Sequence, residues 1–171
     1  GWDTYVVDSA GDVVIETTDY LGGNDSVQSL IDYTLGSNVE KLTLLGTTAV
    51  RATGNASANT ITGNDADNLL TGGAGSDYLS GGAGSDVYVY NRGDGDDHIR
   101  WIRDSLPASI DAIQFGSGIQ SEDVRIFNSN KSIWLSFRDP ITGNFDSSSS
   151  VIIEEGFDAT YGHEIIDEVR F

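Results

Sequence analysis

The sequence predicts an all-β protein: a right-handed parallel β-roll, which is a β-solenoid, with a C-terminal antiparallel β cap. The first reason is a pair of consecutive nine-residue units at residues 72–80 and 81–89, which both read GGxGxD followed by three residues with an apolar one in the middle. The second reason is the change after about residue 104, where glycine becomes rare and apolar and polar residues alternate in longer runs. We therefore expect short stacked strands first and longer strands after them.

The nine-residue unit itself predicts the coil. Its first six residues turn the chain, because glycine permits positive φ angles, and its last three form a short strand whose middle side chain points inward. Two units make one coil, so loops on one side of the roll recur about every 18 residues. A single unit cannot bury its apolar residue, and the units must therefore stack. The predicted inward residues are Tyr5, Ile61, Leu70, Leu79, Tyr88 and Ile99.

The chemistry of the unit indicates a hard cation. The glycine loops bring carbonyl oxygens together and the aspartate adds a carboxylate, which is the all-oxygen shell that Ca2+ prefers. The charge agrees, with 27 acidic against 9 basic residues and a net charge of -18. This imbalance argues against nucleic acid and anionic membranes as partners, and no run is long enough to insert into a membrane. A merely solvated acidic surface would not place glycines before the acids.

Imperfect copies flank the two perfect units. The units at residues 54–62 and 63–71 carry Asn59 and Asn68 in place of the aspartate. Residues 93–99 repeat the pattern after a two-residue slip, and residues 1–6 and 22–27 hold partial copies. We expect three regions: a degenerate repeat and lateral strand lead-in at 1–53, a calcium-binding β-roll at 54–103, and a C-terminal β-strand capping domain at 104–171. Antiparallel strands in the third region would cover the open end of the roll.

The sequence argues against an enzyme. Cysteine is absent, and the two histidines, His98 and His163, do not have metalloprotease spacing. No G-x-S-x-G elbow is present. Neighbouring carboxylates on a strand point to opposite faces, which disfavours paired acid–base work. Trp101 and Trp134 could line a sugar or peptide site, although a role in the core or cap is the favoured interpretation.

These units resemble the RTX family, the hemolysin-type calcium-binding repeats of proteins that bacteria export by type I secretion. Residues 111–171, with the runs at 121–125 and 165–171, are similar to the C-terminal domain associated with such repeats. The resemblance implies a module that is disordered without Ca2+, binds about four or five ions and folds outside the cell. The chain lacks Met and starts at Gly1, so we expect a piece of a larger secreted protein that uses the type I secretion machinery. The alternatives are an adhesive module that binds a sugar or peptide, and the non-catalytic tail of a secreted hydrolase.

The resemblance also implies the ligands, because in the family two same-side loops supply carbonyl oxygens and the side chains of their sixth residues. Site 1 then takes Asn55, Ser57, Asn59, Gly72, Ala74 and Asp77. Site 2 takes Asn64, Ala66, Asn68, Gly81, Ala83 and Asp86. Site 3 takes Gly73, Gly75, Asp77, Arg92, Asp94 and Asp97, across the slip at Tyr90-Asn91. Site 4 takes Gly82, Gly84, Asp86 and Asp111, and site 5 joins Asp3 to Asp25.

Overall fold

The computed structural model describes residues 1–17, 23–48, 50–100, 110–129, 132–154, 157–158, 163–164 and 168–171. Regular structure in these ranges is almost entirely β. The strands of the first sheet, called sheet A, are β1 (Thr4–Val7), β2 (Ser26–Ser29), β4 (Lys41–Leu44), β6 (Thr60–Thr62), β8 (Tyr78–Ser80), β10 (Asp96–Arg100), β12 (Val124–Ser129), β13 (Ser132–Arg138) and β14 (Phe145–Glu154). Those of the second, sheet B, are β3 (Tyr33–Thr34), β5 (Arg51–Thr53), β7 (Leu69–Thr71), β9 (Val87–Tyr90), β11 (Ala112–Phe115) and β17 (Glu168–Arg170). A 3-10 turn, η1 (Ser121–Asp123), precedes β12, and β15 (Phe157–Asp158) pairs with β16 (His163–Glu164).

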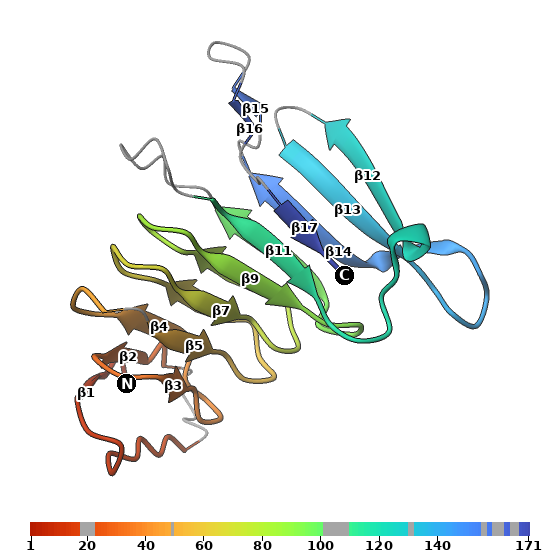
Figure 1. The fold of residues 1–171 in the computed structure, drawn as a ribbon. Helices are drawn as coiled ribbons and strands as arrows, with labels where there is room; N and C mark the ends of the chain where they lie inside the picture. Colours follow the sequence, from red (N-terminus) through yellow and green to blue (C-terminus); the bar gives the residue numbers. More distant parts are fainter. Residues whose placement is uncertain are drawn as a thin grey trace.

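The two sheets form the predicted β-roll. Successive strands from β4 to β11 alternate between sheet A and sheet B, and the strands of each sheet in this stretch are parallel (Figure 1). Ile61 pairs with Leu79 and Leu70 pairs with Tyr88, so equivalent residues are two nine-residue units apart. The all-β class, the stacked parallel strands and the period of the coil are therefore confirmed.

The space between the sheets is filled by the middle residues of the short strands. Ile61, Leu70, Leu79, Tyr88 and Ile99 are at most 3% exposed, as the unit predicts. Tyr5 differs, because it is only half-buried and packs at the margin of this core. It lies on β1, which is the edge strand of sheet A among the described residues.

The strands between residues 26 and 53 belong to the same two sheets as the repeats, and the division of the chain into a lead-in, a roll and a cap stays a prediction. On β4, Leu42 pairs in parallel with Val27 on one side and with Ile61 on the other. Leu42 and Leu44 are buried and their neighbours Lys41 and Thr43 are not. This alternation lets β4 bury its apolar side chains between the sheets as the repeat strands do, even though the loops around it lack the glycine pattern.

The C-terminal strands continue both sheets beyond the repeats. β14 pairs in parallel with β10, and β17 pairs in parallel with β11. β13 is antiparallel to β14 and β12 is antiparallel to β13, which confirms antiparallel strands at this end (Figure 1). Aromatic packing joins the two parts, because the ring of Phe137 lies 4.7 Å from that of Tyr90 and 5.4 Å from that of Phe115.

We predict that one inward rung carries much of the stability of the coil. Ile61→Ala should lower the free energy of unfolding by about 2–5 kcal/mol, because it removes buried methyl groups and leaves a cavity. The neighbouring exposed residue, Thr60, gives a matched control. Thr60→Ala should change the free energy of unfolding by about 0.5 kcal/mol or less. Urea denaturation of both variants in calcium-containing buffer measures the difference. Equal effects would contradict the inward assignment of Ile61.

Candidate metal centre

The loops of the roll lie along two edges. The A edge consists of the loops that lead into sheet A, and its repeat loops are residues 54–59, 72–77 and 91–95. The B edge consists of the loops that lead into sheet B, and its repeat loops are residues 63–68 and 81–86. Successive loops of one edge are neighbours in space, so the predicted partner loops of sites 1, 2 and 3 do lie side by side.

A column of acidic and amide side chains runs along the A edge. Its members occupy the position directly before Thr4, Ser26, Lys41, Thr60, Tyr78 and His98, which are in register across sheet A. They are Asp3, Asp25, Glu40, Asn59, Asp77 and Asp97. The backbone N–H of one member donates to the carboxylate of the next coil, from Asn59 to Asp77 Oδ1 at 2.7 Å and from Asp77 to Asp97 Oδ1 at 3.1 Å.

The same bond recurs elsewhere in the roll. At the N-terminal end of the A edge, the N–H of Asp3 donates to Asp25 Oδ1 at 2.8 Å. Along the B edge, the N–H of Asn68 donates to Asp86 Oδ1, and the N–H of Asp86 donates to Asp111 Oδ1, both at 2.9 Å. One oxygen of each carboxylate is thus held by the preceding coil, and this fixes how the side chain is oriented.

At site 1 the two loops approach so closely that only glycine fits. A Cβ atom on Gly73, where φ is +95°, would lie 2.4 Å from the carbonyl oxygen of Asn55. One on Gly75, where φ is +133°, would lie 2.9 Å from the carbonyl oxygen of Ser57. The carbonyl oxygens of Asn55 and Ser57, which are predicted ligands, therefore face the loop 72–77. The Asp77 carboxylate lies between the same two loops, because it accepts the N–H of Asn59.

Site 2 repeats this geometry on the B edge. Cβ atoms on Gly82 and Gly84 would lie 2.4 and 2.9 Å from the carbonyl oxygens of Asn64 and Ala66. Asn68 and Asp86 are joined by the backbone bond described above, and both are buried. The structure thus brings together the two loops predicted for each of sites 1 and 2, with Ala74 and Ala83 between the contacting glycines.

Site 3 contains buried carboxylate oxygens. Asp77 is fully buried and Asp97 is 2% exposed, and the Oδ2 atom of each has no hydrogen-bond partner among the described residues. Burial, and after it the nearby charge of Asp77, raise the pKa of Asp97 to about 8. Burial also raises the pKa of Asp77 to about 6. The pKa of Asp94 is raised for the same reason. Buried carboxylate oxygens without a donor are unfavourable, so these groups bind either a proton or a cation, and a Ca2+ ion would supply the cation.

The two-residue slip at Tyr90-Asn91 changes which backbone groups of the loop 91–95 could bind an ion at site 3. The loops 72–77 and 91–95 meet in a parallel bridge between Gly75 and Gly95, and the N–H of Gly75 donates to the Asp94 carbonyl at 2.7 Å. The Arg92 guanidinium is directed elsewhere, to the Gly118 carbonyl at 2.9 Å and to Asp123 at 3.1 Å. Asp77 and Asp97 remain aligned, because the slip is absorbed within the loop before β10.

The structure also brings together the acids of sites 4 and 5. Asp111, 8% exposed, accepts a hydrogen bond from Asp86, and Asp25 accepts one from Asp3. Glu16 joins the second pair, with a carboxylate oxygen within 4.8 Å of those of Asp3 and Asp25. Sequence reasoning missed Glu16, which stands outside any repeat, and Glu40. Glu40 did carry a signal, because it directly precedes an alternating strand as each repeat aspartate does.

One coil before Gly73 and Gly82, the equivalent positions in the loops carry asparagine. Asn55 Nδ2 donates to the carbonyl oxygens of Gly36 and Val39, at 2.7 and 2.8 Å. Asn64 Nδ2 donates to those of Leu45 and Thr48, both at 3.1 Å. The next residues in register are Gly73 and Gly82, which have no side chain and leave the facing carbonyl oxygens open. The carbonyl oxygens of the loops before residue 54 thus accept hydrogen bonds from asparagine amides. The carbonyl oxygens that face Gly73 and Gly82 have no such amide partner.

Comparison with known families agrees with this geometry. Residues 53–88 match the family model of the RTX calcium-binding nonapeptide repeat, with 4 copies. The chain therefore contains RTX calcium-binding repeats in this range, which holds the paired loops of sites 1 and 2. The matched family describes a repeat module and no catalytic domain is detected. A search of curated proteins gave no match. The likeness of residues 111–171 to an RTX-associated C-terminal domain stays a prediction.

We predict that the metal-free fold weakens as pH rises. A carboxyl whose pKa is higher in the folded state binds more protons when folded, so the folded form loses stability between the unfolded and folded pKa values. For Asp97 this range runs from about 4 to about 8. The β signal of metal-depleted protein in circular dichroism should therefore fall between these pH values.

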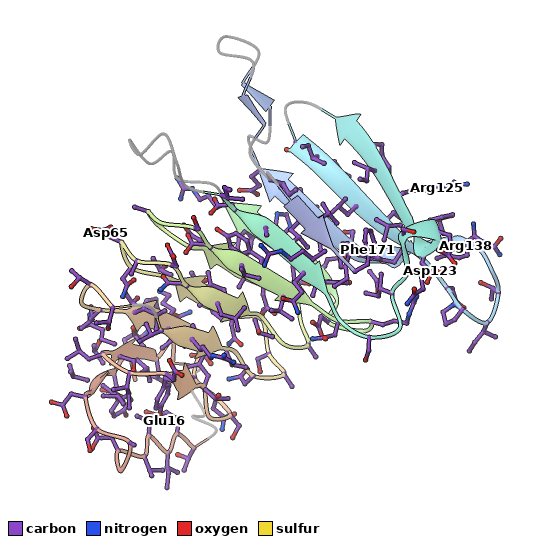
Figure 2. All side chains as sticks on the ribbon, viewed as in Figure 1. Glu16, Asp65, Asp123, Arg125, Arg138 and Phe171 are labelled. Atoms are coloured by element: carbon purple, nitrogen blue, oxygen red, sulfur yellow. The ribbon has the colours of Figure 1, made fainter. Side chains whose placement is uncertain are left out.

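The matched variants separate this effect from bulk charge. Asp97→Asn should flatten the pH dependence, whereas Asp65→Asn, which alters an exposed acid at a loop tip (Figure 2), should leave it unchanged. A wild-type signal that rises with pH would contradict the burial of these carboxylates.

Proposed function

We propose that this chain is a calcium-responsive folding module, in which ions at sites 1 to 5 hold successive loops of the roll together. The observation that carries the proposal is the pair of buried Oδ2 atoms on Asp77 and Asp97, which have no donor among the described residues. Because the unfolded chain presents no preformed site, the free energy of ion binding adds to the free energy of folding.

The charge supports several ions rather than one. Four or five divalent cations would change the net charge from -18 to about -10 or -8. Self-repulsion of the compact state would fall accordingly. The same repulsion keeps a metal-free chain extended, which suits a polypeptide that crosses a secretion channel unfolded and meets calcium outside the cell. RTX repeats are typical of secreted bacterial proteins, and we infer the same location and the type I route for the parent of this chain.

The module is proposed to be non-catalytic. His98 lies on the outer face of sheet A, where it stacks on Tyr78 with ring centroids 4.7 Å apart and contacts Glu154 at 3.0 Å. The side chain of His163 and the whole of Trp101 lie outside the described residues. No described helix is long and apolar enough to cross a membrane. The alternatives, an adhesin module and the tail of a secreted hydrolase, differ in what they attach to and share the calcium-dependent roll.

Calcium, and not magnesium, is expected to fold the chain. The shell is roomy and rich in carbonyl oxygens, whereas Mg2+ demands a tighter octahedron and releases water reluctantly. Titration of metal-depleted protein should give a β signal in circular dichroism with a calcium midpoint on the order of 0.1–1 mM. Equal folding by both ions would indicate simple charge screening, and a β signal that persists in excess chelator at neutral pH would refute coupled folding.

Asp77 is expected to matter more than an acid whose side chain is not a proposed ligand, because it belongs to both site 1 and site 3. Asp77→Asn should raise the calcium midpoint roughly tenfold and make the transition less cooperative. Asp65→Asn removes the same charge from an exposed position and should leave both unchanged. A calcium titration followed by circular dichroism compares the two. Equal damage would show that total acidity, and not the ligand positions, controls folding.

A further inference from the structure

The hairpin of β12 and β13 carries a local reversal of charge. Residues 124–138 contain no Asp or Glu, yet they hold three of the nine basic residues of the chain, Arg125, Lys131 and Arg138. Charges beyond about 8 Å are largely screened at physiological ionic strength, so a binding partner responds to this local sign rather than to the total of -18. Figure 2 shows Arg125 and Arg138 at the end of the molecule opposite Glu16 and the first coils.

These arginines share one face of the sheet with aromatic rings. Leu135 and Phe137 are buried on the inner face of β13, and because side chains alternate along a strand, Trp134 and Ser136 lie on the outer face. Phe127 pairs with Trp134 and Arg125 pairs with Ser136 in the register of β12 and β13. The rings of Phe127 and Trp134 are nearly parallel, at 10°, with centroids 6.4 Å apart.

The two guanidinium groups lie against a third ring and remain open to a ligand. Arg125 Cζ is 3.9 Å, and Arg138 Cζ 5.2 Å, from the ring centroid of Phe145. Among the residues whose side chains the structure describes, no carboxylate forms an ion pair with either guanidinium, in contrast to Arg92 with Asp123. Asp139, next to Arg138, accepts through Oδ1 the N–H groups of two residues in its own turn. Stacking on an aromatic ring positions an arginine without occupying its N–H donors.

We propose that this arginine–aromatic face, formed by Arg125, Phe127, Trp134, Arg138 and Phe145, binds a carboxylated polysaccharide. A guanidinium pairs with a carboxylate through two parallel hydrogen bonds. The apolar faces of aromatic rings pack against the C–H faces of sugar rings. The residues stand on three adjacent strands about 4.8 Å apart, so they form a continuous surface long enough for an extended chain of rings.

Other acidic partners fit this face less well. An acidic peptide would supply carboxylates, but it has no rigid ring for the aromatic side chains and would lose more side-chain freedom on binding. A second copy of this chain would also supply its carboxylates from protein side chains, without a sugar ring for the aromatic side chains. The proposal requires the calcium-loaded fold, and it assigns no role in ion binding to the residues of the face.

The test uses isothermal titration calorimetry of the calcium-loaded chain with three polymers: hyaluronan as the carboxylated polysaccharide, dextran as a neutral one and poly-glutamate as a carboxylated peptide. Hyaluronan should bind, dextran should not, and poly-glutamate should bind at least tenfold more weakly. The double variant Arg125→Gln/Arg138→Gln should bind hyaluronan roughly tenfold more weakly or worse. Arg51→Gln, an exposed substitution on β5 of the roll, is the matched control and should bind as the wild type does.

The calcium midpoint of each variant, measured by circular dichroism, separates this proposal from the folding proposal. An unchanged midpoint with weakened hyaluronan binding supports the face as the binding surface. Absence of binding by the wild type, equal affinity for poly-glutamate or dextran, or equal loss in Arg51→Gln would overturn the proposal. Sedimentation of the calcium-loaded protein tests the remaining occupant. If the wild type is a dimer and the double variant is not, the face binds a second copy of the chain, and the polysaccharide proposal is overturned.

Discussion

The roll depends on one repeated interaction, the hydrogen bond from the backbone N–H of one coil to a carboxylate oxygen of the next. At 2.7 Å between Asn59 and Asp77 and 3.1 Å between Asp77 and Asp97, this bond orients each aspartate so that its second oxygen stays inside the stack. In site 3 that oxygen has no donor among the described residues. The same bond that sets the spacing of the coils thereby creates the need for a cation between them.

The boundary between metal-dependent and metal-independent loops follows from a single side chain in each unit. Asn55 satisfies two carbonyl oxygens of the loop before it, and Asn64 does the same on the other edge. Where glycine replaces these residues, at Gly73 and Gly82, the facing carbonyl oxygens lose their amide partner and an ion can take its place. An amide and a Ca2+ ion are thus alternative ways to join two loops, and the early coils use the one that needs no ion.

The repeat predicts what depends on local spacing and misses what depends on the folded arrangement. Ile61, Leu79 and the other inward residues follow from a period of two units, since a strand of three residues has one inward position. Asp97 was found across the slip because its strand kept the Asp-x-Ile ending. Glu16 could not be found, because it reaches Asp3 and Asp25 from a segment without a repeat. Arg92 was expected to give a backbone ligand, and its side chain proved to join the last repeat loop to Asp123 before the C-terminal strands.

The end of the acidic column explains how the repeats could control the C-terminal strands. In sheet A the residue in register with Asp97 on the next strand is Val151, which is buried and offers no ligand. The column of possible ion ligands therefore ends at β10, and β14, then β13 and β12, follow this strand in the order of sheet A. Without a cation, Asp77 and Asp97 leave buried carboxyl oxygens unsatisfied beside the start of β10, which disfavours this strand. Calcium at site 3 would thus order the strand that the C-terminal sheet needs as its partner, so that the repeats fold first and the strands beyond them follow.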